Sequence, residues 1–163
     1  INNTYAITNA AYSIAKNADA KAIITFSVSG QTTMRMAKER APVQIIGLSP
    51  NLTTSRKMQL VWGVNSCHTE DAHNTTDMVK IACTIAKNKQ LVKPDDNIII
   101  TAGVPFGNAG STNLLRITKI IADKNLNWKI YTTLAIKSIS TEAPTANPVT
   151  PIHVRAGSLS ETK

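Results

Sequence analysis

Two short apolar segments each run directly into a loop of glycine and hydroxyl residues, and this feature limits the fold more than any other. Residues 22–26 lead into the first loop, residues 27–33, and residues 98–102 lead into the second loop, residues 103–113. Short apolar runs of this kind are typical of strands buried on both faces of a parallel sheet. Open α/β sheets bind ligands at the carboxyl ends of such strands. The sequence therefore predicts an α/β fold in which both loops contribute to a ligand site.

Helical and extended segments alternate along the chain. The sequence predicts helices over residues 5–15, 32–40, 52–60 and 74–89, and strands over residues 22–26, 43–48, 61–64, 97–102 and 113–117. This alternation indicates βαβ units and a mainly parallel sheet. Because crossovers between parallel strands are right-handed, the two loops then lie at the same edge of the sheet.

The first and last predicted helices have recognisable caps and inner faces. We expect Asn3 or Thr4 to cap the first helix and Thr75 or Thr76 to cap the last. The predicted inner faces consist of Ile7, Ala11 and Ile14 in the first helix, and of Met78, Ile81, Ala82 and Ile85 in the last.

Length and composition favour one domain followed by a tail. We expect an α/β domain over residues 1–120, then a segment over residues 121–163 with one further strand at 128–136 and a flexible tail rich in Ser, Thr and Pro. The chain begins with Ile and has no signal peptide, so we expect it to be a fragment of a longer protein. It has no run of 18 apolar residues, so no transmembrane helix and no membrane partner are expected.

Several functional classes are disfavoured. The net charge of +8 is scattered and only 4% of the residues are aromatic, so nucleic-acid binding is the weakest hypothesis. Cys67 and Cys83 lack CxxC spacing and are interpreted as free, buried thiols of a reducing cytoplasm. His68 and His73 are five residues apart, which favours a polar loop over a metal site. The second loop lacks the GKS or GKT ending of a nucleotide-binding P-loop.

The first loop has the composition of an anion site. It offers backbone amides around Gly30 at the start of a helix, together with the hydroxyls of Ser27, Ser29, Thr32 and Thr33. The alternative is a helix cap rich in Ser and Thr. Glycines in the second loop (Gly103, Gly107 and Gly110) allow it to fold over a ligand that the first loop holds.

In order and content, these pieces resemble the C-terminal, regulatory domain of pyruvate kinase, especially bacterial forms. The resemblance covers residues 5–117, about two thirds of the chain. It depends on residues 6–8 (AIT), 23–25 (IIT), 29–32 (SGQT), 60–64 (LVWGV), 99–105 (IITAGVP) and 110–114 (GSTNL).

The resemblance implies an α/β three-layer sandwich with a mostly parallel five-stranded sheet that binds a phosphorylated allosteric effector: AMP, a sugar monophosphate or a sugar bisphosphate. The residues implied to hold phosphate are Ser27, Ser29, Gly30, Gln31 and Thr32, and those implied to close over the site are Gly103, Gly107, Asn108, Ala109, Gly110, Ser111 and Thr112. The full enzyme is expected to be a cytoplasmic homotetramer whose separate catalytic barrel uses Mg²⁺ and K⁺. This chain has none of the barrel's motifs, so it is expected to need no cofactor and to be inactive alone.

Two departures from the family pattern bear on the effector. Val28 replaces a residue that is often hydroxylic or acidic. Residues 73–80 lack the Trp and Arg of members that bind fructose 1,6-bisphosphate, which favours a monophosphate, although Lys80 offers a replacement charge. The alternative hypothesis is a free-standing domain of the same fold that binds a small phosphorylated metabolite.

Overall fold

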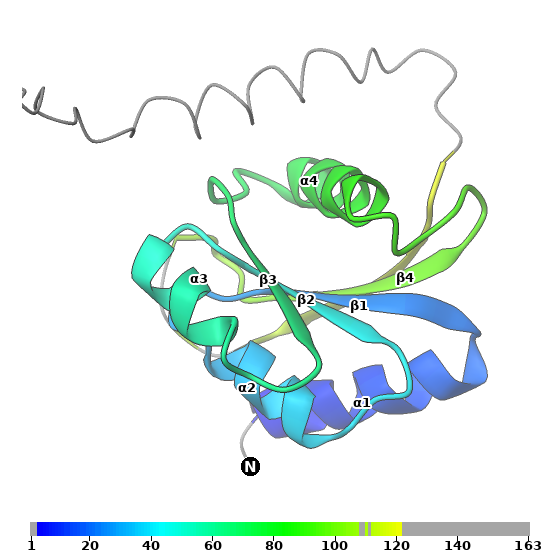
Figure 1. The fold of residues 1–163 in the computed structure, drawn as a ribbon, viewed down its shortest axis with the longest axis horizontal. Helices are drawn as coiled ribbons and strands as arrows, with labels where there is room; N and C mark the ends of the chain where they lie inside the picture. The colour runs from blue at the N-terminus through cyan, green and yellow to red at the C-terminus, as the bar shows by residue number, and fades with distance from the viewer. Residues whose placement is uncertain (1–2, 108–109, 111, 122–163) are drawn as a thin grey trace, which may run out of the picture. The chain divides into compact units, whose positions relative to one another are not determined.

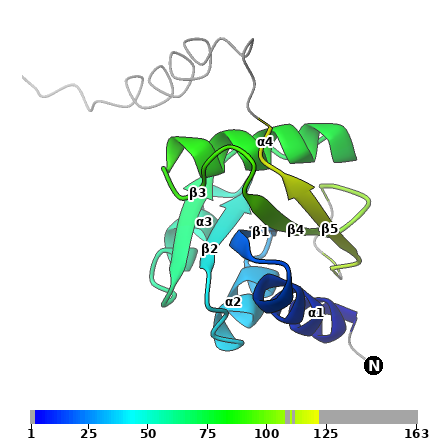
Figure 2. The ribbon, with the colours of Figure 1, turned by 90° about the vertical axis from the view of Figure 1, so that its right-hand side faces the viewer.

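A five-stranded sheet forms the centre of the domain, and helices cover it in one layer on each face (Figures 1 and 2). The computed structural model describes residues 3–107, 110 and 112–121, and the predicted strand at 128–136 lies outside them. The chain divides into two compact units, residues 1–122 and 123–163, and all the described residues belong to the first. The helices are α1 (Asn3–Asn17), α2 (Gln31–Lys38), α3 (Leu52–Met58) and α4 (Thr75–Asn88), and the strands are β1 (Ala20–Phe26), β2 (Gln44–Ser49), β3 (Val64–His68), β4 (Asn97–Ala102) and β5 (Leu114–Lys119).

The strands lie in the order β3-β2-β1-β4-β5. β1 pairs in parallel with both β2 and β4, β2 pairs in parallel with β3, and β5 is antiparallel to β4. The predicted α/β fold with a mostly parallel sheet is confirmed. Because β1 and β4 are parallel neighbours, the two loops that follow them leave the same edge of the sheet.

Alternate residues of the central strands supply the two halves of the core. Ile24 and Ile100 face α4, where Met78 and Ala82 are buried against them. Residues of the opposite parity pack against α1 and α2. Burial on both faces explains why β1 and β4 are almost continuously apolar.

The inner face of α1 differs from the prediction. Thr4, Thr8, Ala11 and Ala15 are the buried residues of this helix, while Ile7 and Ile14 lie only half-buried at its flanks. The Thr8 hydroxyl donates a hydrogen bond to the Thr4 carbonyl at 3.0 Å. This local bond satisfies the hydroxyl, so a threonine can be buried at a position where the sequence pattern predicts an apolar residue.

The helix starts and ends also need correction. The cap of α4 is Asn74, whose side chain accepts from the Asp77 amide, and neither Thr75 nor Thr76 takes this role. Both α2 and α3 end two residues before the predicted positions. For α2 the reason is local: Arg40 has a positive φ of 54°, which turns the chain out of the helix.

The prediction of a strand at residues 61–64 is wrong. β3 begins at Val64, and its pairing continues to Ser49 opposite His68. Leu60 and Trp62 are exposed, and the Arg40 guanidinium lies 4.1 Å from the centre of the Trp62 ring. The apolar residues 61–63 therefore belong to an exposed turn and not to a strand. The edge strand β3, which follows them, is more polar.

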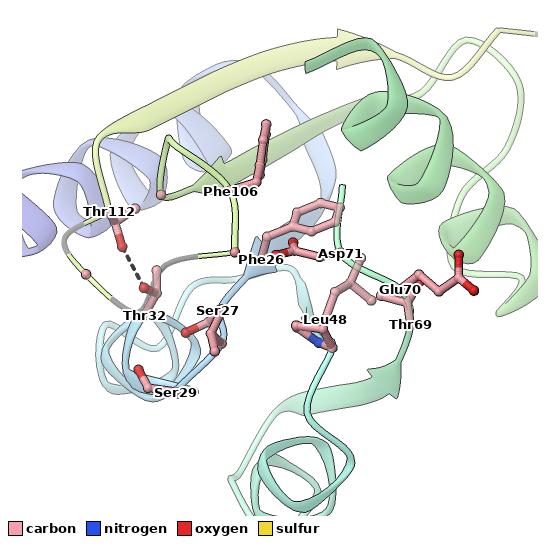
Figure 3. Close-up of a pocket in the computed structure, with 15 residues that line it drawn as sticks. Phe26, Ser27, Ser29, Thr32, Leu48, Thr69, Glu70, Asp71, Phe106 and Thr112 are labelled. Carbon is pink, nitrogen blue, oxygen red and sulfur yellow. Dashed lines mark hydrogen bonds between the residues drawn. The ribbon is translucent and has the colours of Figure 1, made fainter. Parts of the chain in front are cut away.

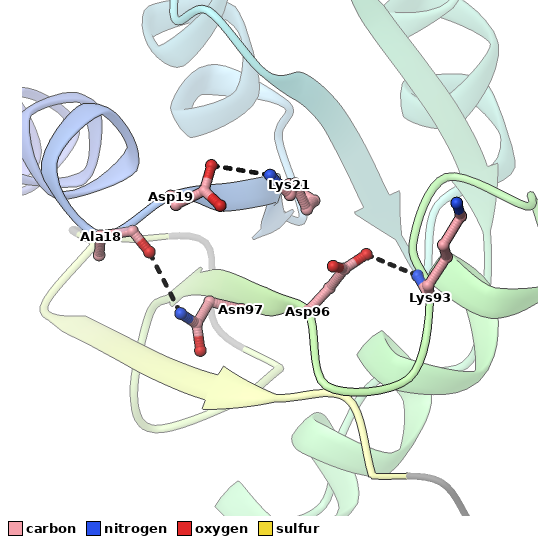
Figure 4. A network of polar contacts seen from close by, with 6 residues as sticks. All are labelled: Ala18, Asp19, Lys21, Lys93, Asp96 and Asn97. Carbon is pink, nitrogen blue, oxygen red and sulfur yellow. Dashed lines mark hydrogen bonds and ion pairs between the residues drawn. The ribbon is translucent and has the colours of Figure 1, made fainter.

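At the amino edge of the sheet, short polar contacts tie the turns together (Figure 4). The Asn97 side chain donates to the Ala18 carbonyl at 3.1 Å, which joins the end of α1 to the start of β4. Asp19 accepts from Lys21 at 2.7 Å, and this hydrogen bond is the main cause of a raised pKa for Lys21. The turns at this edge are thus joined to one another, whereas the two loops predicted to bind a ligand lie at the carboxyl edge.

Candidate functional site

The two loops enclose a pocket at the carboxyl edge of the sheet (Figure 3). Its empty volume, including the part open to solvent, is about 500 Å³. The residues that line it are Phe26, Ser27, Val28, Ser29, Thr32, Leu48, Pro50, Thr69, Glu70, Asp71, Gly103, Phe106, Gly107, Gly110 and Thr112. Both loops thus contribute to one pocket, because β1 and β4 are neighbours in the sheet.

The amino end of α2 opens onto this pocket without a side-chain cap. Gly30 is its N-cap residue, in a left-handed conformation with φ of 79°, and it has no side chain to accept a hydrogen bond. By contrast, the side chains of Asn51 and Asn74 cap α3 and α4. The first-turn amides of α2 therefore lack the side-chain acceptor that the other two helices have, and a helix start of this kind attracts an anion.

Gly30 is required here for a reason that the sequence does not reveal. A Cβ at this position would lie 3.1 Å from Thr54 Cγ2 and 3.3 Å from Met58 Cγ, both on α3. The absence of a side chain thus lets the first loop pack against α3. Neither Gly30 nor Gln31 is among the residues that line the pocket, and the side chain of Gln31 is exposed.

The hydroxyls of the first loop divide into two groups. Ser27, Ser29 and Thr32 line the pocket. Thr33 does not, because it is fully buried and its hydroxyl is hydrogen-bonded to that of Thr25 at 2.7 Å. Thr33 therefore belongs to the core beneath the loop.

Asn113 joins the two ends of the second loop, and its backbone amide donates to the Ala102 carbonyl at 3.1 Å. Asn113 Oδ1 accepts from the Val104 amide at 2.7 Å, and Asn113 Nδ2 donates to the Val104 carbonyl at 2.6 Å. Above this neck, the Thr112 hydroxyl is hydrogen-bonded to that of Thr32 at 2.5 Å, and both residues are buried. The two loops thus meet directly. Asn108, Ala109 and Ser111 lie outside the described residues.

The charge of the pocket is negative. No Lys or Arg is among the described residues that line it, whereas Glu70 and Asp71 are. Lys80, which the sequence offered as a replacement charge, is exposed on α4 and does not line it either. The sequence does not predict a role for these two acidic residues in the pocket, because it predicts the third strand at residues 61–64 and not at Val64–His68. With β3 ending at His68, residues 69–71 leave the same edge of the sheet as the two loops.

The cysteines and histidines form no separate site in the part of the chain that the structure describes. Cys67 and Cys83 are free and half-buried, and burial raises the pKa of both thiols. His68 Nε2 lies 3.1 Å from the Pro50 carbonyl oxygen. No group of three or more His, Cys, Asp or Glu side chains is placed to hold a metal ion within the described ranges. None of the helices described there is long and apolar enough to cross a membrane.

Comparison with known proteins gives a consistent result. The family model "Pyruvate kinase, alpha/beta domain" matches residues 5–118. The pyruvate kinase of Geobacillus stearothermophilus is 41% identical over 109 residues, which cover 67% of this chain and 18% of that protein. The pyruvate kinase of Methylorubrum extorquens is 37% identical over 112 residues, covering 69% of this chain and 23% of the relative.

Among solved structures, Cryptosporidium parvum pyruvate kinase in complex with ADP superposes with a TM-score of 0.67 and 27% sequence identity. The match covers 74% of this chain and 24% of that one. The chain thus spans no more than about a quarter of the length of the relatives it matches.

Proposed function

Because this chain belongs to the pyruvate kinase family, through the α/β domain of that family, we propose that it is a regulatory domain that binds a phosphorylated effector. The observation that carries the proposal is the start of α2, which has no side-chain cap and opens onto a pocket lined by the hydroxyls of Ser27, Ser29 and Thr32. Hydroxyls and first-turn amides donate hydrogen bonds to phosphate oxygens.

The strength of such a site depends on hydrogen bonds rather than on ion pairs. No basic side chain lines the described part of the pocket, so the phosphate charge is met by the helix dipole and by neutral donors. Hydrogen bonds to a charged group contribute about 1.5–3 kcal/mol each. In this proposal the hydroxyls of Ser27 and Ser29 and the first-turn amides of α2, with those of Gly30 and Gln31 among them, hold one phosphate group. The Thr32 hydroxyl joins them as a donor when Thr112 donates in the hydrogen bond that the two threonines share.

In this proposal the second loop closes over the bound effector. Its residues in this role are Gly103, Gly107, Asn108, Ala109, Gly110, Ser111 and Thr112. The hydrogen bond between Thr112 and Thr32 joins it to the loop that holds phosphate, so occupancy of one loop affects the other. A ligand that binds the closed arrangement more tightly shifts the population toward it, and contacts with the rest of the protein transmit that shift.

The remaining functions of the parent protein lie outside this domain. We propose that the parent is a cytoplasmic, homotetrameric pyruvate kinase of glycolysis, which transfers phosphate from phosphoenolpyruvate to ADP on a separate catalytic barrel. The Mg²⁺ and K⁺ of that reaction would bind on the barrel.

The test is binding of phosphorylated compounds to the full chain. Calorimetry and thermal shift with AMP, ribose 5-phosphate and fructose 1,6-bisphosphate should identify at least one ligand. A ligand present at 100 times its dissociation constant stabilises the folded state by about 2.7 kcal/mol.

Ser29→Ala should weaken binding of that ligand about tenfold, the equivalent of one hydrogen bond to a charged group. The matched control is Ser13→Ala, on the exposed side of α1, which should leave binding unchanged. The proposal fails if none of the compounds binds, or if Ser29→Ala and Ser13→Ala bind them equally well.

A further inference from the structure

One acidic side chain, that of Asp71, faces into the pocket without a basic partner. Asp71 is half-buried, and its Oδ1 accepts a hydrogen bond from the Ala72 amide at 3.0 Å. Its Oδ2 lies toward the second loop, 3.7 Å from the position that a Cβ on Gly107 would occupy. Within the described residues the structure gives this carboxylate no ion pair. The carboxylate can therefore accept further hydrogen bonds from donors in the pocket.

The neighbouring carboxylate differs in position. Glu70 also lines the rim, but it is exposed and its carboxyl group points away from the serines of the first loop (Figure 3). Asp71 instead points toward the interior, beside Phe26 and across from Ser27 and Thr32 (Figure 3). Two acidic residues, adjacent in sequence, thus have unequal access to a bound molecule.

The pocket consequently has two chemically different ends. The α2 end offers hydroxyl and amide donors, which suit phosphate oxygens, and the Asp71 end offers an acceptor that carries a negative charge. A second phosphate placed at the Asp71 end would meet like charge, which is unfavourable in a partly desolvated site. Adjacent sugar hydroxyls would instead donate to the carboxylate, which accepts bidentate pairs of hydrogen bonds.

Resting on the proposed function, we infer that Asp71 determines the class of effector: it accepts hydrogen bonds from vicinal hydroxyls of a sugar monophosphate and excludes a second phosphate. Phe26 and Phe106 also line the pocket, and in this inference Phe106 provides most of the apolar surface for the sugar ring, because Phe26 is largely buried in the core. Asp71 is thus a specificity-determining residue, and the hydroxyls of the first loop provide the phosphate affinity.

The test compares three compounds by calorimetry on the full chain: ribose 5-phosphate, 2-deoxyribose 5-phosphate and fructose 1,6-bisphosphate. Loss of the 2-hydroxyl removes a hydrogen bond to a charged group, so 2-deoxyribose 5-phosphate should bind about tenfold more weakly than ribose 5-phosphate. Fructose 1,6-bisphosphate should bind more weakly than ribose 5-phosphate. These comparisons require no variant, so they hold even if a substitution prevents folding.

Asp71→Asn keeps the acceptor for the Ala72 amide but removes the charge. In this variant, 2-deoxyribose 5-phosphate should bind only about threefold more weakly than ribose 5-phosphate, because a neutral hydrogen bond replaces a charged one. Fructose 1,6-bisphosphate should bind about tenfold more tightly than it does to the unaltered chain, because the charge repulsion disappears. Glu70→Gln makes the same change of charge one residue away. Because this charge is exposed, the affinities of 2-deoxyribose 5-phosphate and fructose 1,6-bisphosphate relative to ribose 5-phosphate should both stay within about twofold of those of the unaltered chain.

The outcomes separate this inference from the proposed function. One outcome overturns the inference while the proposed function stands. In it, ribose 5-phosphate binds and Ser29→Ala weakens that binding, but Asp71→Asn leaves the relative affinities of the other two compounds unchanged. Equal binding of fructose 1,6-bisphosphate and ribose 5-phosphate to the unaltered chain also overturns it, as does an equal effect of Glu70→Gln. If no phosphorylated compound binds, the proposed function fails and this inference fails with it.

Discussion

The two loops at the carboxyl edge of the sheet are held in place by different means. The first loop is built into the core: the Ser27 amide donates to the Leu48 carbonyl at 2.9 Å, Gly30 packs against α3, and Thr33 bonds to Thr25 beneath it. The second loop is fixed at its neck by the exposed side chain of Asn113, and by the Thr112 hydroxyl, which bonds to Thr32 of the first loop.

This difference bears on the roles proposed for the two loops, of which one holds phosphate and the other closes over it. Parts of a protein with many buried contacts open only at a large cost in free energy, whereas those with few, exposed contacts open more readily. In the described residues, the contacts of the proposed phosphate-holding loop are largely buried, whereas the neck of the proposed closing loop depends on the exposed side chain of Asn113. Substitutions matched between the two loops should therefore have unequal effects.

The largest difference is expected from one substitution made in both loops. Gly30→Ala places a Cβ 3.1 Å from Thr54 at a position whose φ is 79°, a left-handed conformation that is unfavourable for alanine. We expect it to lower the free energy of unfolding by about 2 kcal/mol, since the left-handed conformation alone costs about 1–2 kcal/mol. Urea denaturation of the full chain measures the change.

Gly110→Ala, in the second loop, is the matched control. Among the described residues, no atom lies within 4 Å of the position that a Cβ on Gly110 would occupy, and the φ of Gly110 is not in the left-handed range. The free energy of unfolding should change by no more than about 0.5 kcal/mol. Equal losses for Gly30→Ala and Gly110→Ala would show that the two loops are packed alike, contrary to the comparison.

A smaller effect is expected from Thr33→Val, which removes a buried hydroxyl while keeping the shape of the side chain. The Thr25 hydroxyl would be left with a long contact of 3.4 Å to the Ile46 carbonyl. An unsatisfied buried polar group costs about 1–3 kcal/mol, and this remaining contact places the expected loss at about 1.5 kcal/mol. Thr53→Val, at an exposed position of α3, is the control and should cost less than about 0.5 kcal/mol. A loss no greater than that of the control would mean that Thr33 does not anchor the first loop.

The sequence predicts the central strands well because their burial dictates their composition. β4 occupies the predicted residues 97–102, and its pairing with β1 brings the two loops together as expected. The failures lie where tertiary contacts decide. The run at residues 60–64 is apolar, yet Leu60 and Trp62 are exposed and the strand begins only at Val64.

The site shows the same limit. Ser27, Ser29 and Thr32, which the sequence singles out because they lie between the end of a strand and the first turn of a helix, line the pocket. The sequence cannot separate Thr33 from Thr32, since one step along α2 turns a hydroxyl from the pocket into the core. Nor does it find Asp71, whose place in the pocket depends on where the edge strand β3 ends.

The smallest effect on stability, but the most local one, is expected from Asn113→Ala. The variant loses both hydrogen bonds to Val104, and because the side chain is exposed, the free energy of unfolding should fall by only about 0.5–1 kcal/mol. The Val104 amide should lose its protection against hydrogen exchange, while the Ser27 amide, bonded to Leu48 in the first loop, should keep it. If the second loop closes over the effector, the same variant should also bind ribose 5-phosphate more weakly, since part of the binding energy is then used to order the loop. Unchanged exchange at Val104 would mean that contacts other than Asn113 hold the neck, and the two loops would then differ less than their hydrogen bonds suggest.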